Sequence, residues 1–256
     1  MSKNIFENYS DFYDLFYQGK DYEAESEYVK NLLNKFNIRD GEILELGCGT
    51  GRHAHFLTNY GYKVHGIEKS SKMVSRANLS KDFFCEVGDI TDFNIGKLFD
   101  SAISLFHVMS YMTEKRSFIN ALSNANKHLK KGGIFIFDVW YSPAVYSDLP
   151  SNRVRHVTYK DTIITRVANP QVNFNENVVE VEYEFTQEAK NKKLLGSFKE
   201  THKMRHFSLL EIDLAAEMTG FKRVLSEEFL TKNPPSNETW GVCFVLKKIN
   251  EKIYTS

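Results

Sequence analysis

The stretch Ile43-Leu44-Glu45-Leu46-Gly47-Cys48-Gly49-Thr50-Gly51 decides the fold of this chain. An apolar run of strand length carries one acidic residue and then breaks into alternating glycines, after which the residues from Arg52 onward favour a helix. Glycines at a strand-to-helix turn let the backbone approach a ligand closely, because a Cβ atom would fill that space. The stretch therefore predicts a ligand-binding loop in an α/β unit.

A second acidic residue stands where a nucleoside cofactor needs one. Val64-His65-Gly66-Ile67-Glu68 predicts a second strand that ends on a carboxylate. That carboxylate follows the glycines by about 20 residues, which is the spacing at which an acid binds the two hydroxyls of a ribose. The first seventy residues thus predict a protein that binds a nucleoside cofactor.

The glycine spacing and its acid narrow the class of cofactor. A dinucleotide fingerprint requires G-x-G-x-x-G, and its third glycine would fall on Arg52. Glu45 would repel a pyrophosphate, whereas it would attract a cofactor that carries an ammonium and a sulfonium. Both residues disfavour an NAD-dependent oxidoreductase, which remains an alternative, as does an ordinary turn between strand and helix.

These residues, together with Gly88-Asp89-Ile90 after a third predicted strand, carry a family resemblance. The chain resembles the class I S-adenosylmethionine-dependent methyltransferases, whose first motif is E/D-x-G-x-G-x-G. The resemblance implies S-adenosylmethionine as the cofactor and methyl transfer as the activity. A cofactor-binding protein that kept the fold without catalysis is the alternative from another functional class.

Composition limits the partners and the compartment. The chain has 256 residues, of which 42% are hydrophobic, and its 33 basic side chains balance its 33 acidic ones. A neutral chain disfavours a nucleic-acid substrate. Cys48, Cys85 and Cys243 are scattered and form no C-x-x-C, which predicts a cytoplasmic protein without disulfides or a zinc site. No apolar segment is long enough to predict a membrane span.

Hydrophobic periodicity predicts a mostly parallel, doubly wound, Rossmann-like α/β sheet. Helical periods cover residues 21–36 and about 114–130, with Ser70 as the predicted N-cap of a short helix. Lys130-Lys131-Gly132-Gly133 predicts the end of the second long helix. Further strands are expected over residues 64–67, 83–87, 99–106, 134–137, 222–229 and 241–246.

An antiparallel β insertion is predicted after the fifth strand, because the period changes to two between Arg153 and about Phe207. Ala168-Asn169-Pro170 and Asn191-Lys192-Lys193 are the expected turns, and Ser208 opens a capping box for a last helix. The predicted units are an N-terminal helical lid (1–40), a cofactor core (41–150), the insertion (151–207) and the end of the core (208–256). The second face of the insertion would either pair two subunits in a homodimer or roof the site.

Five polar residues at predicted strand ends mark the ligand edge of the sheet, since ligands of open α/β sheets bind there. The resemblance assigns Gly47 and Gly49 to the methionine part of the cofactor, Glu68 to the ribose and Asp89 to the adenine amino group. Asp89 could instead cap a helix, and Met73 and Ile90 could be plain core residues. The strand-end residues are Glu45, Glu68, Asp89, His107 and Asp138, and the cofactor-binding candidates are Tyr13, Tyr17, Tyr22, Glu45, Gly47, Gly49, Glu68, Lys69, Met73, Asp89, Ile90 and Phe106.

The N-terminal aromatics resemble the segment that closes over the cofactor in small-molecule members of the family. Tyr13, Tyr17 and Tyr22 would hold a sulfonium by cation–π attraction. The competing interpretation is a hydrophobic first helix that packs on the sheet.

Catalysis of methyl transfer requires mainly the placement of the acceptor, and a base only where a proton must leave. His107, after the fourth predicted strand, is the first candidate base, and Tyr111 is the second. The competing interpretation is that His107 only packs at a strand end. His202 and His206 would share one face of a strand, but two histidines are too few for a metal site.

The acceptor side resembles the N-methyltransferases that act on nucleotide-linked amino sugars. Trp140 and Tyr141 match their paired aromatics, and Arg166-Val167 matches an Arg-Val run that helps to hold the nucleotide. The substrate-binding candidates are Tyr9, Trp140, Tyr141, Arg166 and His202.

Two departures separate this chain from those enzymes. Tyr111 aligns with their histidine, and Asn237-Glu238-Thr239-Trp240-Gly241 replaces a Ser-Gly-Arg-Gly loop that meets phosphates. The expected partner is therefore a nucleotide-linked small molecule from surface-polysaccharide or secondary-metabolite biosynthesis. N- and O-methylation both remain open, including O-methylation of a nucleotide-linked phosphoramidate for capsule decoration.

Overall fold

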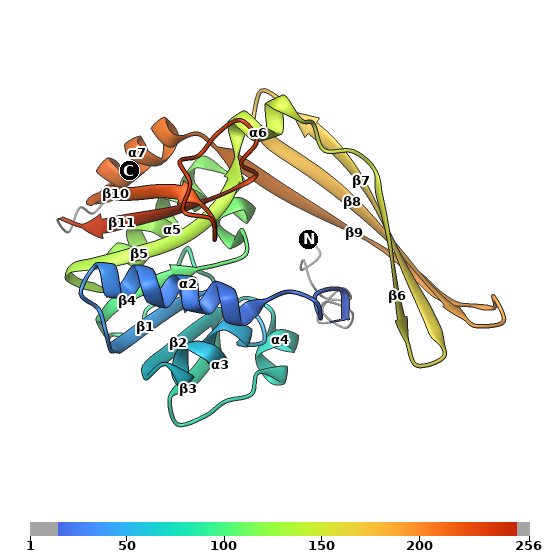
Figure 1. Ribbon diagram of the computed structural model, residues 1–256, viewed down its shortest axis with the longest axis horizontal. Helices are drawn as coiled ribbons and strands as arrows, with labels where there is room; N and C mark the ends of the chain where they lie inside the picture. Colours follow the sequence, from blue (N-terminus) through green and yellow to red (C-terminus); the bar gives the residue numbers. More distant parts are fainter. Residues whose placement is uncertain (1–14, 250–256) are drawn as a thin grey trace.

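The computed structural model describes residues 15–249, so the candidates Tyr9 and Tyr13 lie outside the described residues. Its core is a parallel sheet in the order β3-β2-β1-β4-β5, which β11 continues antiparallel to β5, and β10 continues antiparallel to β11 (Figure 1). The core strands are β1 (Gly41–Leu46), β2 (Tyr62–Glu68), β3 (Phe83–Val87), β4 (Phe99–Ser104), β5 (Leu129–Tyr141), β10 (Phe221–Glu228) and β11 (Gly241–Lys248). The predicted doubly wound α/β class is confirmed.

Helices cover both faces of this sheet, and one apolar cluster lies on each face. The middle of β5, from Ile134 to Val139, is buried throughout, as expected for a strand covered on both sides. The helical elements are α2 (Tyr22–Lys35), α3 (Arg52–Asn59), α4 (Ser71–Arg76), the 3-10 helix η1 (Val108–Tyr111), α5 (Lys115–Lys127), α6 (Ser142–Ser147) and α7 (Leu209–Met218).

Two helix starts follow the predicted capping chemistry. The Ser70 hydroxyl accepts a hydrogen bond from the Met73 amide and caps α4. Ser208 and Glu211 form the complete capping box of α7, in which each side chain bonds the other residue's backbone N–H. Each cap satisfies amides that a helix start would leave without partners.

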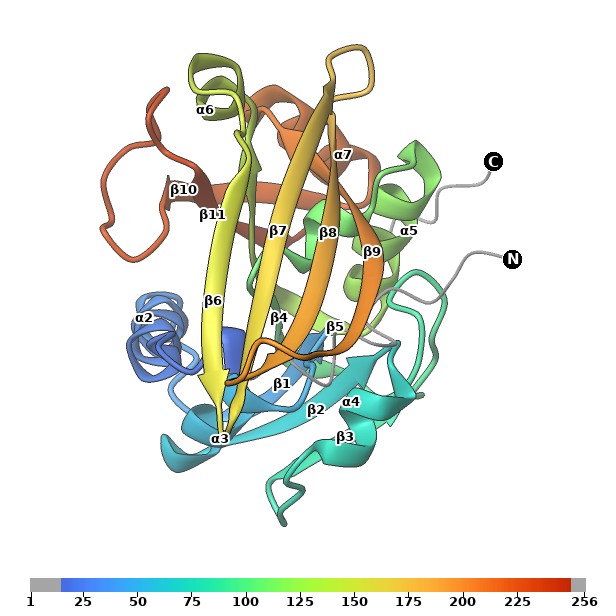
Figure 2. The same cartoon turned by 90° about the vertical axis from the view of Figure 1, so that its right-hand side faces the viewer.

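The insertion is a four-stranded antiparallel sheet that follows α6 in the chain. Its last strand pairs with the end of β5 and so joins the insertion to the core. The insertion comprises β6 (Arg153–Tyr159), β7 (Thr162–Asn173), β8 (Val178–Ala189) and β9 (Leu194–Phe207). Trp140 and Tyr141 of β5 pair with His206 and Phe207 of β9, so the insertion is hydrogen-bonded to the core. Figure 2 shows its four strands side by side in front of the core.

The two faces of the insertion differ as the alternation predicts. One face, called the inner face here, carries Val179, Val181, Tyr183, Phe185 and the residues opposite them; the other is the outer face. Val179 and Val181 of the inner face are buried, whereas the outer-face glutamates pair with lysines of β9. Phe16 packs among Ile164 and Phe185, so the segment before α2 lies against this sheet.

One predicted turn is wrong and the other is confirmed. The chain turns between β8 and β9 at the predicted residues 191–193, but β7 runs straight through Pro170. Pairing between β6 and β7 stops at Ala168, so Pro170 lies on an open edge, where its missing N–H leaves no partner unsatisfied. The connections that the periodicity missed lie at residues 160–161 and 174–177.

Two further boundaries differ from the expectation. The strand predicted to reach Phe106 ends at Ser104, because Phe106 and His107 both adopt the left-handed backbone region. The segment predicted to end the second long helix instead begins β5, since Leu129 pairs with Phe99 of β4. Pairing with a neighbouring strand therefore overrides the local helix-ending signal.

Candidate active site

Glu45 is a buried carboxylate beneath the glycine loop. It is 2% exposed, and its Oε1 lies 3.7 Å from Nδ1 of His53. Its Oε2 has no hydrogen-bond partner among the described residues. Burial, and then the negative potential of Cys85 and Glu68, raises the pKa of Glu45 to about 8. The ionised form of such a buried carboxylate is stabilised when a cationic ligand binds beside it.

Glu68 ends β2 and ties the glycine loop to the start of α4. Its Oε2 accepts a hydrogen bond from the Gly49 amide at 3.0 Å, and its Oε1 accepts one from the Ser70 amide at 2.8 Å. Burial raises the pKa of Glu68, although these backbone N–H groups oppose the shift. The carboxylate therefore stands directly beside the loop that the sequence assigned to the cofactor.

The glycine loop has one crowded and one open side. A Cβ atom on Gly47 would meet Val108 at 2.5 Å, so glycine is required there by packing. Gly49 has φ of +57°, and a Cβ atom on it would meet only the Met73 sulfur, at 3.8 Å. The space beside Gly49 is therefore not filled by protein atoms, and a ligand can approach the backbone there.

The adenine candidates lie around the ends of β2 and β3. Asp89 forms an ion pair with Lys69 at 2.9 Å, and it also accepts hydrogen bonds from the amide and hydroxyl of Thr91. It therefore caps a turn, while its carboxylate remains partly exposed. Met73 is 4% exposed and Ile90 is 6% exposed and part of the core. Their roles toward a cofactor stay predictions.

His107 lies on a strained stretch above a buried acid. Two consecutive left-handed residues, Phe106 and His107, have φ of 63° and 61°, which is uncommon outside glycine and concentrates at functional sites. The His107 amide donates to both carboxylate oxygens of Asp138 at 3.2 Å, and its Nδ1 lies 2.7 Å from Oδ2. The contact between the side chains is electrostatic, because Nδ1 has no well-aligned hydrogen-bond acceptor.

Asp138 is 1% exposed, whereas the His107 side chain is 25% exposed. Burial alone would raise the pKa of Asp138, but the charge and hydrogen bonds of His107 and the charge of Lys20 hold it below its usual value. Asp138 is thus a fixed anion that can orient and stabilise an imidazolium at the open end of β4.

Lys20, Glu25 and His53 were not among the predicted site residues, but they lie beside the predicted aromatics. The Lys20 ammonium lies 4.4 Å from the Tyr22 ring centroid and 4.2 Å from that of Phe106, and it makes an ion pair with Glu25. Glu25 in turn contacts Nε2 of His53 at 2.7 Å. Burial lowers the pKa of His53, which favours the neutral form of this histidine.

Tyr17 and Tyr22 approach the same place from the N-terminal segment. The Tyr17 ring meets Phe106 edge-on at 4.9 Å, and the Tyr22 ring meets His53 at 5.0 Å. The structure therefore places Tyr17 beside Phe106, and Tyr22 beside the Lys20 ammonium that also lies over Phe106.

Tyr111 belongs to a partly buried hydrogen-bonded chain with His202 and Glu200. Its hydroxyl bonds Nδ1 of His202 at 2.8 Å, and Nε2 of His202 contacts Glu200 at 3.1 Å. Burial raises the pKa of Tyr111 well above its usual value, so the phenol stays protonated. His202, predicted to bind substrate, uses both ring nitrogens within the protein.

Trp140 and Tyr141 are consecutive in β5 and therefore point to opposite faces. Trp140 lies edge-on to His107 at 6.3 Å and to Trp240 at 5.9 Å. Tyr141 is 8% exposed and packs in the main core, and its contact with substrate stays a prediction. Arg166 reaches the site from β7 and donates to the Tyr17 hydroxyl at 3.4 Å.

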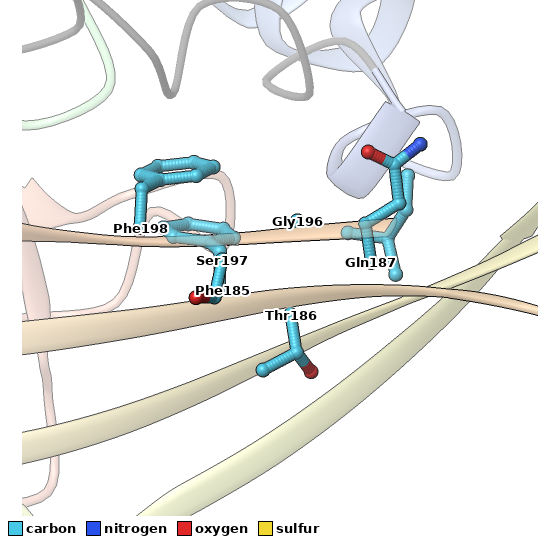
Figure 3. Close-up of a pocket in the computed structure, with 7 residues that line it drawn as sticks. Phe185, Thr186, Gln187, Gly196, Ser197 and Phe198 are labelled. Atoms are coloured by element: carbon cyan, nitrogen blue, oxygen red, sulfur yellow. The ribbon is translucent and has the colours of Figure 1, made fainter. Parts of the chain in front are cut away.

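A hollow on the insertion is lined in part by residues of the apolar cluster that holds Phe16 and Tyr17. It is lined by Ile164, Phe185, Thr186, Gln187, Gly196, Ser197 and Phe198 (Figure 3). The rings of Phe185 and Phe198 stack with centroids 4.6 Å apart. No charged side chain lines the hollow, so the chemistry belongs to the carboxyl edge of the parallel sheet.

The carboxyl edge fits a cationic nucleoside cofactor. Its buried acids are Glu25, Glu45, Glu68 and Asp138, against which the described residues place the cation Lys20. The unpartnered Oε2 of Glu45 and the open side of Gly49 fit an ammonium group and a sulfonium-bearing chain. The same surplus of carboxylates would repel a pyrophosphate.

Other cofactor types find less support. Residues 15–249 contain no cluster of three or more metal-ligating side chains, and the three cysteines are free and buried. Across the same residues no helix combines the length and apolar character needed to cross a membrane.

Comparison with known proteins agrees with this geometry. Residues 43–133 match the family described as a methyltransferase domain. The chain is 27% identical over 221 residues to dTDP-3-amino-3,4,6-trideoxy-alpha-D-glucopyranose N,N-dimethyltransferase of Streptomyces venezuelae, covering 84% of this chain and 90% of that protein. It is 24% identical to dTDP-3-amino-3,6-dideoxy-alpha-D-glucopyranose N,N-dimethyltransferase of Streptomyces fradiae, covering 88% and 86%.

Solved structures show the same fold. The crystal structure of Streptomyces venezuelae DesVI matches with a TM-score of 0.79 and 24% identity, over 95% of this chain and 99% of that one. The protein is an enzyme that uses S-adenosylmethionine. The matched methyltransferase domain, residues 43–133, spans the glycine loop, Glu68 and Asp89, so the similarity includes the residues that the sequence assigned to the cofactor.

Proposed function

We propose that this enzyme methylates the amino group of a nucleotide-linked amino sugar. The observation that carries the proposal is the extent of the similarity to the N,N-dimethyltransferase of Streptomyces venezuelae. It covers 84% of the chain, so it extends beyond the cofactor domain at residues 43–133 into the part that faces the acceptor.

The residues at the carboxyl edge would hold the cofactor. Glu45 would meet its ammonium, Glu68 its ribose hydroxyls and Asp89 its adenine amino group, while Phe106 and Tyr17 would line the methionine arm. When bound, S-adenosylmethionine supplies an electrophilic methyl group attached to a sulfonium. The chain then has to position the acceptor and receive any proton that the acceptor loses.

His107 is the proposed acceptor of that proton. Its side chain is partly exposed, whereas Asp138 below it is a buried anion. A carboxylate in this position orients the imidazole and stabilises the imidazolium that forms when the ring takes up a proton. A neutral amine needs this help less than a hydroxyl does.

The histidine–aspartate pair is therefore the observation that keeps O-methylation as a second candidate. An acceptor hydroxyl, including one on a nucleotide-linked phosphoramidate, must lose its proton as the new bond forms. The relatives described above are named for amino sugars, which favours nitrogen as the acceptor atom.

The test begins with calorimetric titration of the full chain with S-adenosylhomocysteine and, in parallel, with NAD. Binding of the first alone is expected. The loaded enzyme is then offered a dTDP-linked 3-amino sugar and its 3-hydroxy counterpart, and methyl uptake is followed by mass spectrometry. Methylation of the amino sugar only is expected; methylation of the hydroxy sugar only would replace the first candidate with the second.

A further inference from the structure

Three arginines lie at neighbouring positions on the inner face of the insertion. Arg155 of β6 is directly opposite Arg166 of β7, and Arg153 is opposite Ala168. Residues that are opposite each other, or two apart along one strand, point to the same side of a sheet. Arg166 is also opposite Phe185, so this side is the inner face.

The contacts of Arg166 show where this group lies. Its guanidinium is 5.0 Å from the ring centroids of both Phe16 and Tyr183, and it reaches the Tyr17 hydroxyl. Tyr17 meets Phe106 at the end of β4. One arginine of the group therefore borders the site, and the other two continue from it along β6.

The charges of Arg153 and Arg155 are not balanced by carboxylates of the described residues. Arg153 and Arg155 are exposed, and neither forms an ion pair with a carboxylate of residues 15–249. Like charges that are directly opposite in a sheet destabilise it. On the outer face the arrangement is reversed, because Lys199 and Lys203 each pair with glutamates of β8.

An aromatic surface connects the arginines to His107. Trp140 lies beside His107, and Trp240 lies beside Trp140. Both tryptophans pack in one cluster with Ala168, the residue opposite Arg153, and with Tyr183. A molecule whose reacting group is at His107 can thus lay a ring on the tryptophans and extend toward the arginines.

We propose that Arg153, Arg155 and Arg166 together bind the diphosphate of the acceptor, an inference that rests on the proposed function. Guanidinium groups bind phosphate oxygens in a bidentate manner, and two phosphates offset the repulsion between opposed arginines. The loop at residues 237–241 contains no basic residue that could bind the diphosphate instead. Arg153 and Arg155 are the residues that the proposal adds to Arg166.

The competing explanation is protection of an edge strand. β6 is the last strand of the sheet, and charged side chains on such strands discourage pairing with other chains. Protection of that kind does not require two arginines opposite each other on the face toward the active site. It also predicts no dependence of ligand binding on Arg155.

The experiment is calorimetric titration of the full chain, saturated with S-adenosylhomocysteine, with dTDP and with inorganic pyrophosphate. Arg155→Gln and Arg153→Gln are compared with Lys203→Gln, which removes the same charge from the outer face. We expect each arginine change to weaken dTDP binding by about tenfold or more and Lys203→Gln to leave it within about twofold. Without ligand, Arg155→Gln should melt higher by roughly 1–3 °C, because a like-charge contact is relieved.

The outcomes separate this inference from the function on which it rests. Equal effects of Arg155→Gln and Lys203→Gln, or unchanged dTDP affinity in both arginine variants, would overturn the diphosphate site. A wild-type chain that binds S-adenosylhomocysteine but neither dTDP nor pyrophosphate would overturn it too, while leaving the methyltransferase intact. Failure of S-adenosylhomocysteine to bind would contradict the proposed function itself.

Discussion

The carboxyl edge of the parallel sheet and the inner face of the insertion carry charges of opposite sign. The first buries Glu45, Glu68 and Asp138, whereas the second presents arginines beside aromatic rings. A cationic cofactor suits the first and an anionic acceptor suits the second. The near-zero net charge of the whole chain hides this division, so overall composition says little about either ligand.

The two regions also differ in how they obtain their geometry. The acids at the carboxyl edge are held by backbone amides and turns next to them in the fold, as with Glu68 and the amides of Gly49 and Ser70. The inner face depends on the register between strands, since a slip of one residue would turn every arginine outward. The cofactor side is therefore set by turns at the ends of neighbouring parallel strands, and the acceptor side is set by the register of antiparallel strands.

The largest effect should come from filling the cofactor space. Gly49→Val places a branched side chain where protein packing leaves room, and we expect S-adenosylhomocysteine affinity to fall by at least about a hundredfold. Gly96→Val is the matched control, because Gly96 also has a positive φ, of +67°, but no neighbour within 4 Å. Calorimetry with a thermal melt checks both variants; equal losses of binding would remove Gly49 from the cofactor site.

The next effect tests whether His107 belongs to the acceptor side. His107→Ala removes the proposed proton acceptor, and turnover should fall by about a hundredfold while S-adenosylhomocysteine affinity stays the same. Asp138→Asn should also lower turnover, since the ring loses its buried anion. Initial rates measured across a pH series provide the check. Turnover equal to wild type in His107→Ala would make His107 a packing residue.

A smaller effect should appear when the charge of Glu45 is removed. Its pKa is raised to about 8 in the folded protein and lies near 4.5 when unfolded, so the folded state binds more protons between these values. The free energy of unfolding should therefore decrease as pH rises from about 4.5 to 8. Glu45→Gln should lack this decrease and bind S-adenosylhomocysteine about tenfold more weakly.

Denaturant titrations at several pH values measure the first effect, and calorimetry in buffers of different ionisation enthalpy measures the second. Wild-type binding near neutral pH should release a proton, because the ligand's ammonium favours the ionised carboxylate. A variant whose stability followed the same pH course as wild type would show that Glu45 is not the titrating group.

The smallest effect concerns the link between the two regions. Tyr111→Phe removes the hydroxyl that bonds His202 of the insertion, and should lower the free energy of unfolding by about 1 kcal/mol. Tyr146→Phe is the control, since its hydroxyl bonds Asn177 at an exposed position and should cost less. Chemical denaturation measures both, and a larger loss in Tyr146→Phe than in Tyr111→Phe would contradict this reading.

Local sequence patterns predicted most elements of the fold. The caps at Ser70 and Ser208, the glycine turn and the alternation of β8 depend on neighbours within a few positions, and all are present. Pro170 and residues 130–133 misled the prediction, because strand pairing with distant residues outweighed the local turn and helix-end signals.

The sequence alone determined the cofactor edge, because its loop, acids and strand ends are each encoded in short contiguous motifs. Only the tertiary structure decided which distant groups meet. It places Asp138 beneath His107, Lys20 over Phe106, and Arg155 opposite Arg166, and it turns Tyr141 away from Trp140. The physical reason is that contacts between strands depend on register and on burial of whole faces, which no single segment specifies.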